Sequence, residues 1–166
     1  MLPLIALEGI DKSGKATQAR ILARKIGRLG RMVEVIAFPD YKTVLGRVIK
    51  SYLSGEADLC PEIRQLLFAA NRWERRMDLE TWLGEGRVVV ADRYVPSGLV
   101  YGLANGLELD WMVNLERGLP ASDLVIVVDV SVATAFRRGG WRKDVYEGDR
   151  EFLERVRGAY LCLAER

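Results

Sequence analysis

Short apolar runs recur along the chain, and stretches with helical spacing separate them. Residues 4–7, 32–38, 87–91 and 124–130 predict four strands. The last two runs are apolar on both faces, which is typical of strands in a parallel sheet that helices cover. The apolar spacing predicts helices over residues 17–29, 45–53, 61–83, 132–138 and 150–166. Gly30 suits the end of the first helix, and Pro61 suits the first turn of the third.

Strands that alternate with helices predict an α/β fold, a doubly wound parallel sheet flanked by helices. The 166 residues suit one domain, 1–166, with a substantial core, and we find no internal repeat, low-complexity tract or interdomain linker. Ligands of this fold lie beyond the carboxyl ends of the strands. The functional site is therefore expected there.

Composition narrows the classes of function. Apolar residues make up 49% of the chain, charged residues 29%, and the net charge is only +2, so bulk charge favours neither a nucleic-acid nor a membrane partner. The chain lacks histidine, and Cys60 and Cys162 lie far apart, which argues against a zinc site and a histidine-dependent triad and favours buried or incidental thiols. The amino-terminal residues show no basic leader and no apolar segment near spanning length, so we expect a cytoplasmic protein.

The stretch LEGIDKSGKAT contains the pattern G-x-x-x-x-G-K from Gly9 to Lys15. Backbone N–H groups of such a loop cradle phosphates, and a lysine at this position reaches the β and γ phosphates. The alternative is an ordinary turn between a strand and a helix. Because the loop follows an apolar strand and opens a helix, we favour an ATP-phosphate site made of Gly9, Asp11, Lys12, Ser13, Gly14, Lys15, Ala16 and Thr17.

Ala16 stands where this signature places a serine or threonine that contacts magnesium. Mg²⁺ keeps several waters and takes few protein ligands, so the loss of one hydroxyl does not exclude it. Thr17 supplies a hydroxyl only if the loop shifts by one residue; otherwise it bonds to backbone at the helix start. Asp92 is another source of metal contact, directly or through water.

Asp92 and Arg93 follow the apolar run of residues 88–91, at the carboxyl end of a predicted strand. One interpretation is an Asp–Arg pair that only caps the strand. We favour a functional pair, because two opposite charges lie beside a predicted phosphate loop.

Three stretches, EGIDKSGKATQ, LLFAANRWER and ADRYVPSGLVYG, together resemble the thymidylate kinase family in order and spacing. FPDYKTVLGRVIKSYLSGE resembles that family's phosphate-acceptor segment, and ERGLPASDLVIVVDV its later strand, so the resemblance covers nearly the whole chain. It implies the three-layered nucleoside monophosphate kinase type of the P-loop NTPase fold. The implied reaction is transfer of the ATP γ-phosphate to thymidine monophosphate (dTMP) with Mg²⁺, usually by a homodimer.

The resemblance also implies roles for single residues. Asp11 falls near the acceptor 3′-hydroxyl, and Lys12 falls where one subtype carries a catalytic arginine. Phe68 and Arg72 match the pair that stacks on thymine and bonds its exocyclic oxygen, although a core phenylalanine with a solvated arginine is the ordinary alternative. The implied catalytic residues are Lys12, Lys15, Asp92 and Arg93; the implied dTMP site is Asp11, Phe38, Pro39, Lys42, Phe68, Arg72, Arg93, Ser97, Gly98, Tyr101 and Tyr146.

Residues 137–149 resemble the family's lid, whose cations would be Arg137, Arg138, Arg142 and Lys143, although such a run is usually a solvated face. The chain departs from the family at Ala16, at Tyr41 and Lys42, which replace an arginine on the acceptor phosphate, and at Arg166, before the last strand and helix. Two alternatives stay open: a kinase for another nucleoside monophosphate, and a nucleotide-binding regulator with weak catalysis.

Overall fold

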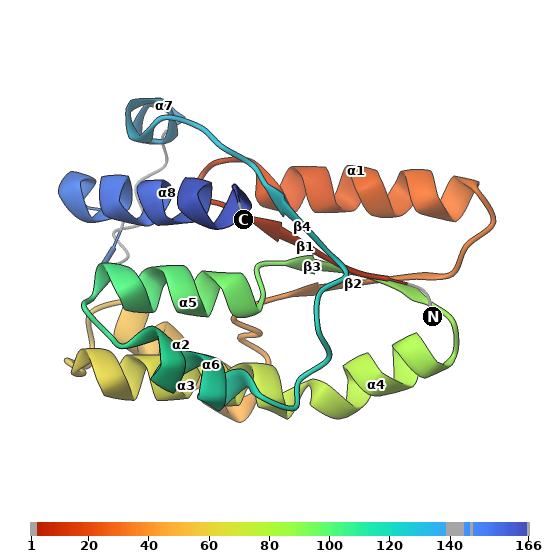
Figure 1. Cartoon of the computed structure of the whole chain (residues 1–166), viewed down its shortest axis with the longest axis horizontal. Coiled ribbons are helices and arrows are strands. Elements are labelled where there is room, and N and C mark those ends of the chain that lie inside the picture. The colour runs from red at the N-terminus through yellow and green to blue at the C-terminus, as the bar shows by residue number, and fades with distance from the viewer. Residues whose placement is uncertain (1–2, 139–144, 147, 166) are drawn as a thin grey trace.

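A computed structural model describes residues 3–138, 145–146 and 148–165, which form a parallel sheet between layers of helices (Figure 1). The predicted lid residues Arg142 and Lys143 lie outside the described residues. The strands are β1 (Leu4–Glu8), β2 (Val33–Ala37), β3 (Val88–Asp92) and β4 (Leu124–Val127). The helices are α1 (Lys15–Arg28), α2 (Val44–Leu53), α3 (Pro61–Glu74), α4 (Arg76–Gly84), α5 (Val95–Ala104), α6 (Leu109–Glu116), α7 (Val132–Arg137) and α8 (Arg150–Ala164).

The strand order in the sheet is β2-β3-β1-β4, and every neighbouring pair is parallel. Strands β1 and β3 lie side by side in the middle, with Leu7 opposite Asp92. The loops that follow these two strands therefore leave the sheet next to each other, at its carboxyl edge. This topology confirms the expected doubly wound α/β fold.

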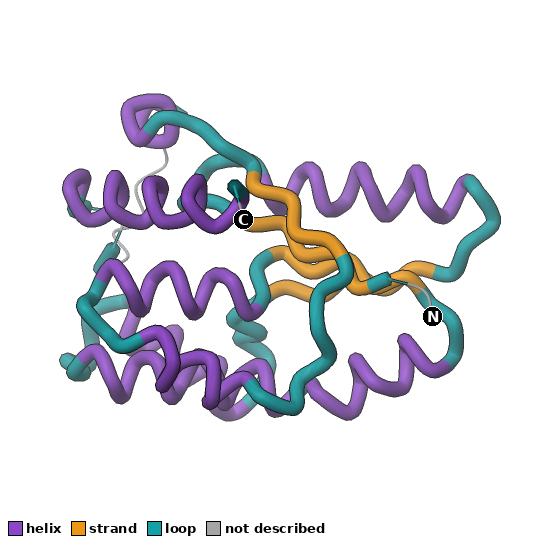
Figure 2. Tube along the Cα trace, viewed as in Figure 1, coloured by secondary structure: helices purple, strands orange, loops and turns teal. Residues whose placement is uncertain are grey.

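Both faces of the central strands are buried because helices cover the sheet on each side (Figure 2). Leu4 and Ala6 of β1 pack with the cluster that includes Leu79 of α4, whereas Ile5 and Leu7 pack with the cluster that includes Ala19 of α1. Successive residues of a strand point to opposite faces, so a central strand that helices cover on both sides needs apolar residues at successive positions.

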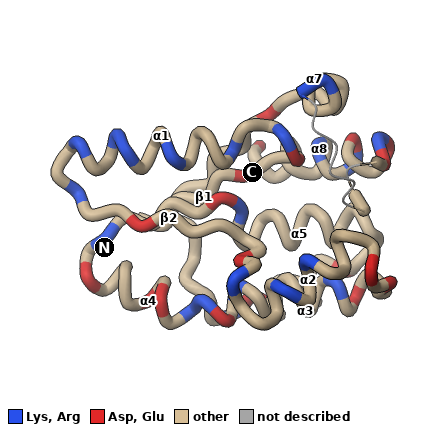
Figure 3. The backbone as a smooth tube through the Cα atoms, turned by 180° about the vertical axis from the view of Figure 1, so that it is seen from behind, with Lys and Arg blue, Asp and Glu red and all other residues tan. Residues whose placement is uncertain are grey.

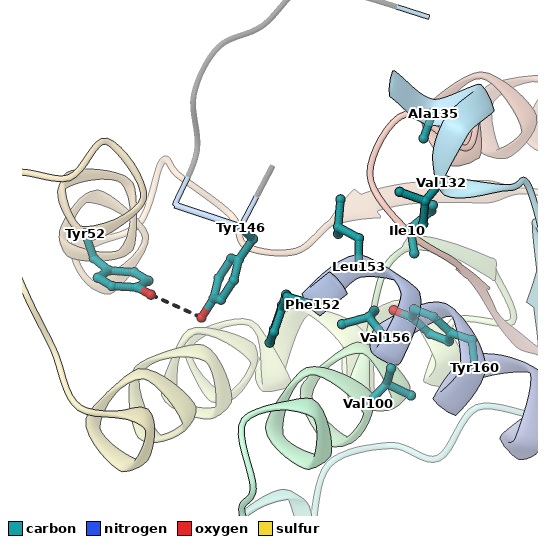
Figure 4. Packing of buried hydrophobic residues seen from close by; sticks show 10 residues of the cluster. All are labelled: Ile10, Tyr52, Val100, Val132, Ala135, Tyr146, Phe152, Leu153, Val156 and Tyr160. Atoms are coloured by element: carbon teal, nitrogen blue, oxygen red, sulfur yellow. Dashed lines mark hydrogen bonds between the residues drawn. The ribbon is translucent and has the colours of Figure 1, made fainter. Parts of the chain in front are cut away.

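A third apolar cluster lies beyond the carboxyl edge of the sheet, between α5, α7 and α8 (Figure 4). Ile10 of the phosphate loop and Val100 of α5 meet Val156 and Tyr160 of α8 there, and all four are at most 2% exposed. This packing holds the last described helix against the region where ligands of the fold bind.

Two expectations about helices are wrong or incomplete. Residues 61–83 form parts of two helices rather than one, because Arg75 leaves helical geometry (φ −105°, ψ 5°); its guanidinium pairs with Asp40 and Asp78. Helices α5 and α6 do not appear in the sequence prediction. Glycines at positions 98 and 102 weaken the helical signal of α5.

Strand β4 does not have the environment predicted for residues 124–130. It ends at Val127, forms an edge of the sheet, and leaves Leu124 51% exposed. The predicted cover on both faces is therefore wrong for this strand.

The surface carries charges of both signs, but α1 presents only lysine and arginine among its charged residues (Figure 3). Cys60 and Cys162 are exposed and free, so of the two expected alternatives the buried one is wrong. None of the helices in the described part of the chain is both long and apolar enough to span a membrane.

Candidate functional site

The phosphate loop joins β1 to α1 through a left-handed backbone. Gly9 has φ 136°, Lys12 φ 61° and Gly14 φ 108°. A methyl group on Gly9 would lie 2.5 Å from the carbonyl oxygen of Val128, so only glycine fits that position. The amino-terminal N–H groups of α1, which begins at Lys15, face the loop as in anion-binding helix starts.

Lys15 is 6% exposed, and its Nζ donates to the carbonyl oxygen of Ile10 at 2.6 Å. Burial lowers the pKa of the Lys15 ammonium group to about 7, and the positive charge of Arg93 acts in the same direction. Asp11 and Asp92 oppose this shift. The loop thus holds a cation whose charge an incoming anion would stabilise.

Arg93 follows β3 and adopts φ 67°, which turns its side chain across the phosphate loop. Its Nη2 donates to Asp11 at 2.6 Å, and its Nη1 donates to the hydroxyls of Ser97 at 3.2 Å and Tyr160 at 3.3 Å. The carboxylate that holds Arg93 is therefore Asp11 rather than the adjacent Asp92. Together, the residues predicted at the ends of β1 and β3 form one charged group.

A cavity opens next to this charged group, between α2, α3 and α5. Every residue predicted for the acceptor site lines it except Lys42, which is exposed. Tyr41 lines the cavity in place of Lys42. The lining residues from the prediction are Asp11, Phe38, Pro39, Phe68, Arg72, Arg93, Ser97, Gly98, Tyr101 and Tyr146.

Arg72 is a buried member of this lining, 2% exposed, and its guanidinium pairs with Glu116. A methyl group on Gly98 would lie 2.5 Å from Nη2 of Arg72, so the absence of a side chain on α5 makes room for the guanidinium. Phe68 is half-buried one turn earlier on α3. The alternative of a core phenylalanine with a solvated arginine is wrong.

Tyr146 closes one side of the cavity. Its hydroxyl accepts a hydrogen bond from Tyr52 at 3.2 Å, and its ring stacks on Phe152 with a centroid distance of 5.1 Å (Figure 4). The guanidinium of Arg64 lies 5.9 Å from the ring centroid. Aromatic packing and a cation thus fix this tyrosine of the predicted lid against α2, α3 and α8.

The described cations of the predicted lid, Arg137 and Arg138, lie at the end of α7. Arg138 donates to the carbonyl oxygens of Ser13 at 2.7 Å and Lys12 at 3.1 Å. Arg137 is exposed and donates to Thr134 at 2.9 Å. Arg138, but not Arg137, reaches the predicted phosphate site.

Few described side chains near the phosphate loop could bind a metal ion. Within residues 3–138, 145–146 and 148–165, no three His, Cys, Asp or Glu side chains cluster as a metal site. Ala16 and Thr17 are exposed in the first turn of α1. Asp92 is half-buried near Lys15, and one carboxylate beside nucleotide phosphates fits the way proteins hold Mg²⁺.

Sequence reasoning missed several residues of this region. Arg64 and Gln65 of α3 line the cavity, while Glu8 and Tyr160 lie behind it and contact the neighbours of Arg93. Glu8 is a carboxylate directly after the apolar run of β1, and this position could have marked it as a candidate. Tyr160 shares its helical spacing with ordinary core residues of α8, so nothing in the pattern sets it apart.

Comparison with known proteins decides the family, because a family model described as thymidylate kinase matches residues 7–166. The chain belongs to the thymidylate kinase family. A thymidylate kinase of Arabidopsis thaliana is 40% identical over 162 residues, which cover 98% of this chain and 61% of that protein. The human thymidylate kinase is 37% identical over 154 residues, 92% of this chain and 72% of that protein.

A solved structure agrees with these sequence matches. The thymidylate kinase of Candida albicans superposes with a TM-score of 0.87 at 32% identity, over 98% of this chain and 77% of that chain. The chain thus spans less than two thirds of the Arabidopsis protein and about three quarters of the Candida structure. Membership of the thymidylate kinase family and its nucleoside monophosphate kinase fold are confirmed.

Proposed function

We propose that this chain is a thymidylate kinase that transfers the γ-phosphate of ATP to dTMP, giving dTDP and ADP. The observation that carries the proposal is the position of Arg93, which pairs with Asp11 of the phosphate loop and also lines the cavity that holds Phe68 and Arg72. In this proposal, one guanidinium would stand between the donor phosphates and the base of the acceptor. The match to the thymidylate kinase family supports this assignment.

The donor phosphates would bind the loop from Gly9 to Thr17. Its backbone N–H groups and the start of α1 attract anions, and protonated Lys15 would neutralise the β and γ phosphates. Arg138 reaches the same loop from the end of α7. Lys12, at the turn of the loop, would add positive charge near the transferred group.

The acceptor would lie in the cavity with its base toward α3 and its phosphate toward Arg93. Phe68 offers a ring for stacking, and Arg72 offers N–H donors to an exocyclic oxygen of thymine. The hydroxyl of Tyr101 donates a hydrogen bond to the carboxylate of Asp11 at 3.1 Å. A sugar hydroxyl of the acceptor would lie next to these two side chains. Tyr146 would cover the sugar.

Transfer of a phosphoryl group passes through a loose transition state, so positioning and charge neutralisation dominate catalysis. Arg93 would stabilise charge on the moving group from a position that Asp11 fixes. A strong general base is not required, which agrees with a sequence that lacks histidine. When bound with ATP, Mg²⁺ would neutralise phosphate charge, with Asp92 as its protein contact directly or through water.

We also propose that the protein acts as a homodimer in the cytoplasm. Helices α2 and α3 pack against each other and expose apolar side chains, among them Val44 at 63% and Ile63 at 43%. Burial of such side chains against a second copy would remove apolar surface from water. Light scattering coupled to size exclusion measures the mass of the assembly.

Steady-state turnover with a panel of acceptors tests the main proposal. Phosphoryl transfer from ATP with Mg²⁺ is measured for the deoxy monophosphates of thymidine, uridine, guanosine and adenosine. We expect the highest kcat/KM for dTMP. A higher value for another acceptor would make the chain a kinase for that nucleotide, and nucleotide binding without turnover would make it a regulator.

A further inference from the structure

A buried carboxylate lies directly behind Arg93. Glu8, the last residue of β1, is 0% exposed and accepts hydrogen bonds from the hydroxyls of Ser97 at 2.5 Å and Tyr160 at 2.9 Å, and from the backbone N–H of Tyr94 at 2.8 Å. Burial of a carboxylate is costly unless several donors satisfy it, and this one has three.

The two hydroxyls that contact Glu8 also accept hydrogen bonds from Arg93, at 3.2 Å to Ser97 and 3.3 Å to Tyr160. They lie 2.8 Å from each other, so the two hydroxyls and Oε2 of Glu8 form a triangle of short contacts. Each hydroxyl has one proton, and when both donate to Oε2 of Glu8 neither proton is left to point at Arg93. The lone pairs that remain face the guanidinium, which can only donate.

We propose that Glu8 and Tyr160 are positioning residues for Arg93: they orient the two hydroxyls so that lone pairs, not protons, face its Nη1. Asp11 holds Nη2 from the other side, so the guanidinium is fixed at both ends. This inference rests on the proposed kinase function, in which Arg93 stabilises the transferred group. Through Tyr160, helix α8 would thus help to position the arginine that acts in the reaction.

Neither positioning residue is available to substrate. Tyr160 is 1% exposed, and neither it nor Glu8 lines the acceptor cavity. Figure 4 shows Tyr160 within the packed cluster, beside Val156 and Val100. A change at Tyr160 should therefore act on the reaction through Arg93 and leave the donor site intact.

The test compares kcat and the two KM values for the parent chain, Tyr160→Phe, Glu8→Gln, Arg93→Lys and the double variant Arg93→Lys/Tyr160→Phe. We expect Tyr160→Phe to lower kcat about 5–10-fold and Glu8→Gln by at least about tenfold, with KM for ATP within about twofold. In the Arg93→Lys background, Tyr160→Phe should change kcat less than about twofold, because lysine lacks the fork that the hydroxyl holds.

Asp123→Ala is the control for loss of stability alone. Its carboxylate accepts from the N–H of Leu4 at 2.8 Å, at the amino edge of the sheet and far from Arg93 in the fold. It should lower the melting temperature without a change in kcat. If Tyr160→Phe does not fold, Ser97→Ala takes its place in the double-variant comparison, because this variant removes the other hydroxyl.

Two outcomes would overturn the inference: an unchanged kcat in Tyr160→Phe, or equal losses in the parent and the Arg93→Lys background. The side-chain Nε–H signal of Arg93 in NMR spectra gives a readout that needs no turnover. It should shift in Tyr160→Phe and stay in place in Asp123→Ala. If the parent transfers no phosphoryl group, the proposed function fails, and this signal alone decides whether Tyr160 positions Arg93.

Discussion

Arg93 donates through Nη2 to the carboxylate of Asp11 at 2.6 Å, and this contact ties the end of β3 to the phosphate loop after β1. Burial alone would raise the pKa of the Asp11 carboxyl, but the charges of Arg93 and Lys15 outweigh it and lower the pKa below its ordinary value. The carboxylate thus stays ionised at neutral pH. The ion pair spans the boundary between the proposed donor and acceptor sites.

Asp11→Asn should lower kcat/KM for dTMP about 100-fold, because the amide keeps the shape but loses the charge that holds Arg93. Steady-state kinetics at neutral pH measures this loss. Asp129→Asn is the control, since Asp129 pairs with Arg157 at 2.7 Å on the surface, where an ion pair contributes little. Equal kinetics for Asp11→Asn and the parent chain would exclude a role for this pair in positioning.

Gly98→Ala should raise KM for dTMP about tenfold or more and leave KM for ATP unchanged. The added methyl group would lie 2.5 Å from Nη2 of Arg72 and 3.2 Å from Nε2 of Gln65, so the guanidinium must move. Gly158→Ala on α8 is the matched control, because nothing lies within 4 Å of its added methyl group. The control should keep both KM values. A normal KM for dTMP in Gly98→Ala would place the base elsewhere.

Binding of ATP should take up protons at pH 8. With its pKa lowered to about 7, Lys15 is largely neutral at that pH in the free chain, and bound phosphate restores its charge. Uptake should approach about one proton per ATP near pH 8 and vanish at pH 6, where Lys15 is already protonated. Calorimetry in two buffers of different ionisation enthalpy measures it; equal heats in both at pH 8 would contradict the prediction.

Ala16→Ser should lower the Mg²⁺ concentration at half-maximal rate about 3–10-fold, because the new hydroxyl adds one neutral oxygen ligand beside the phosphates. The rate at saturating Mg²⁺ should change little. Ala23→Ser, further along α1, is the control and should keep the Mg²⁺ dependence of the parent chain. An unchanged Mg²⁺ dependence in Ala16→Ser would mean that residue 16 does not face the metal.

Features that depend on a short stretch of the chain could be predicted from the residues of that stretch. The glycine loop before α1 and the apolar run followed by Asp92 and Arg93 were predicted from the residues alone, and the structure brings both to the carboxyl edge of the sheet. The pair of Phe68 and Arg72 was expected only because of the resemblance to the thymidylate kinase family, and both residues line the cavity. The loop requires glycine at position 9 for steric reasons, and such a requirement leaves a signature in the sequence.

Features that depend on contacts between distant segments were not predicted. Arg75, where the helix breaks, pairs with Asp40 from a distant segment, and Met112 of α6 fills the space beside Gly102 of α5. Glu8 and Tyr160 are 152 positions apart and acquire a shared role only when α8 packs against α5. Spacing along the chain carries no signal for such a pair.

Lys12 and Arg93 are the only non-glycine residues with positive φ in the described part of the chain. A left-handed backbone costs an ordinary residue about 1–2 kcal/mol, and glycine avoids most of that cost. At position 12, selection for heat resistance alone would therefore favour glycine and remove a cation proposed to act on phosphate. At position 93 the ion pair with Asp11 opposes such a change, because glycine would leave that carboxylate without its partner. Thermostability and turnover thus oppose each other at Lys12, so a thermostabilised variant should gain its stability elsewhere in the fold.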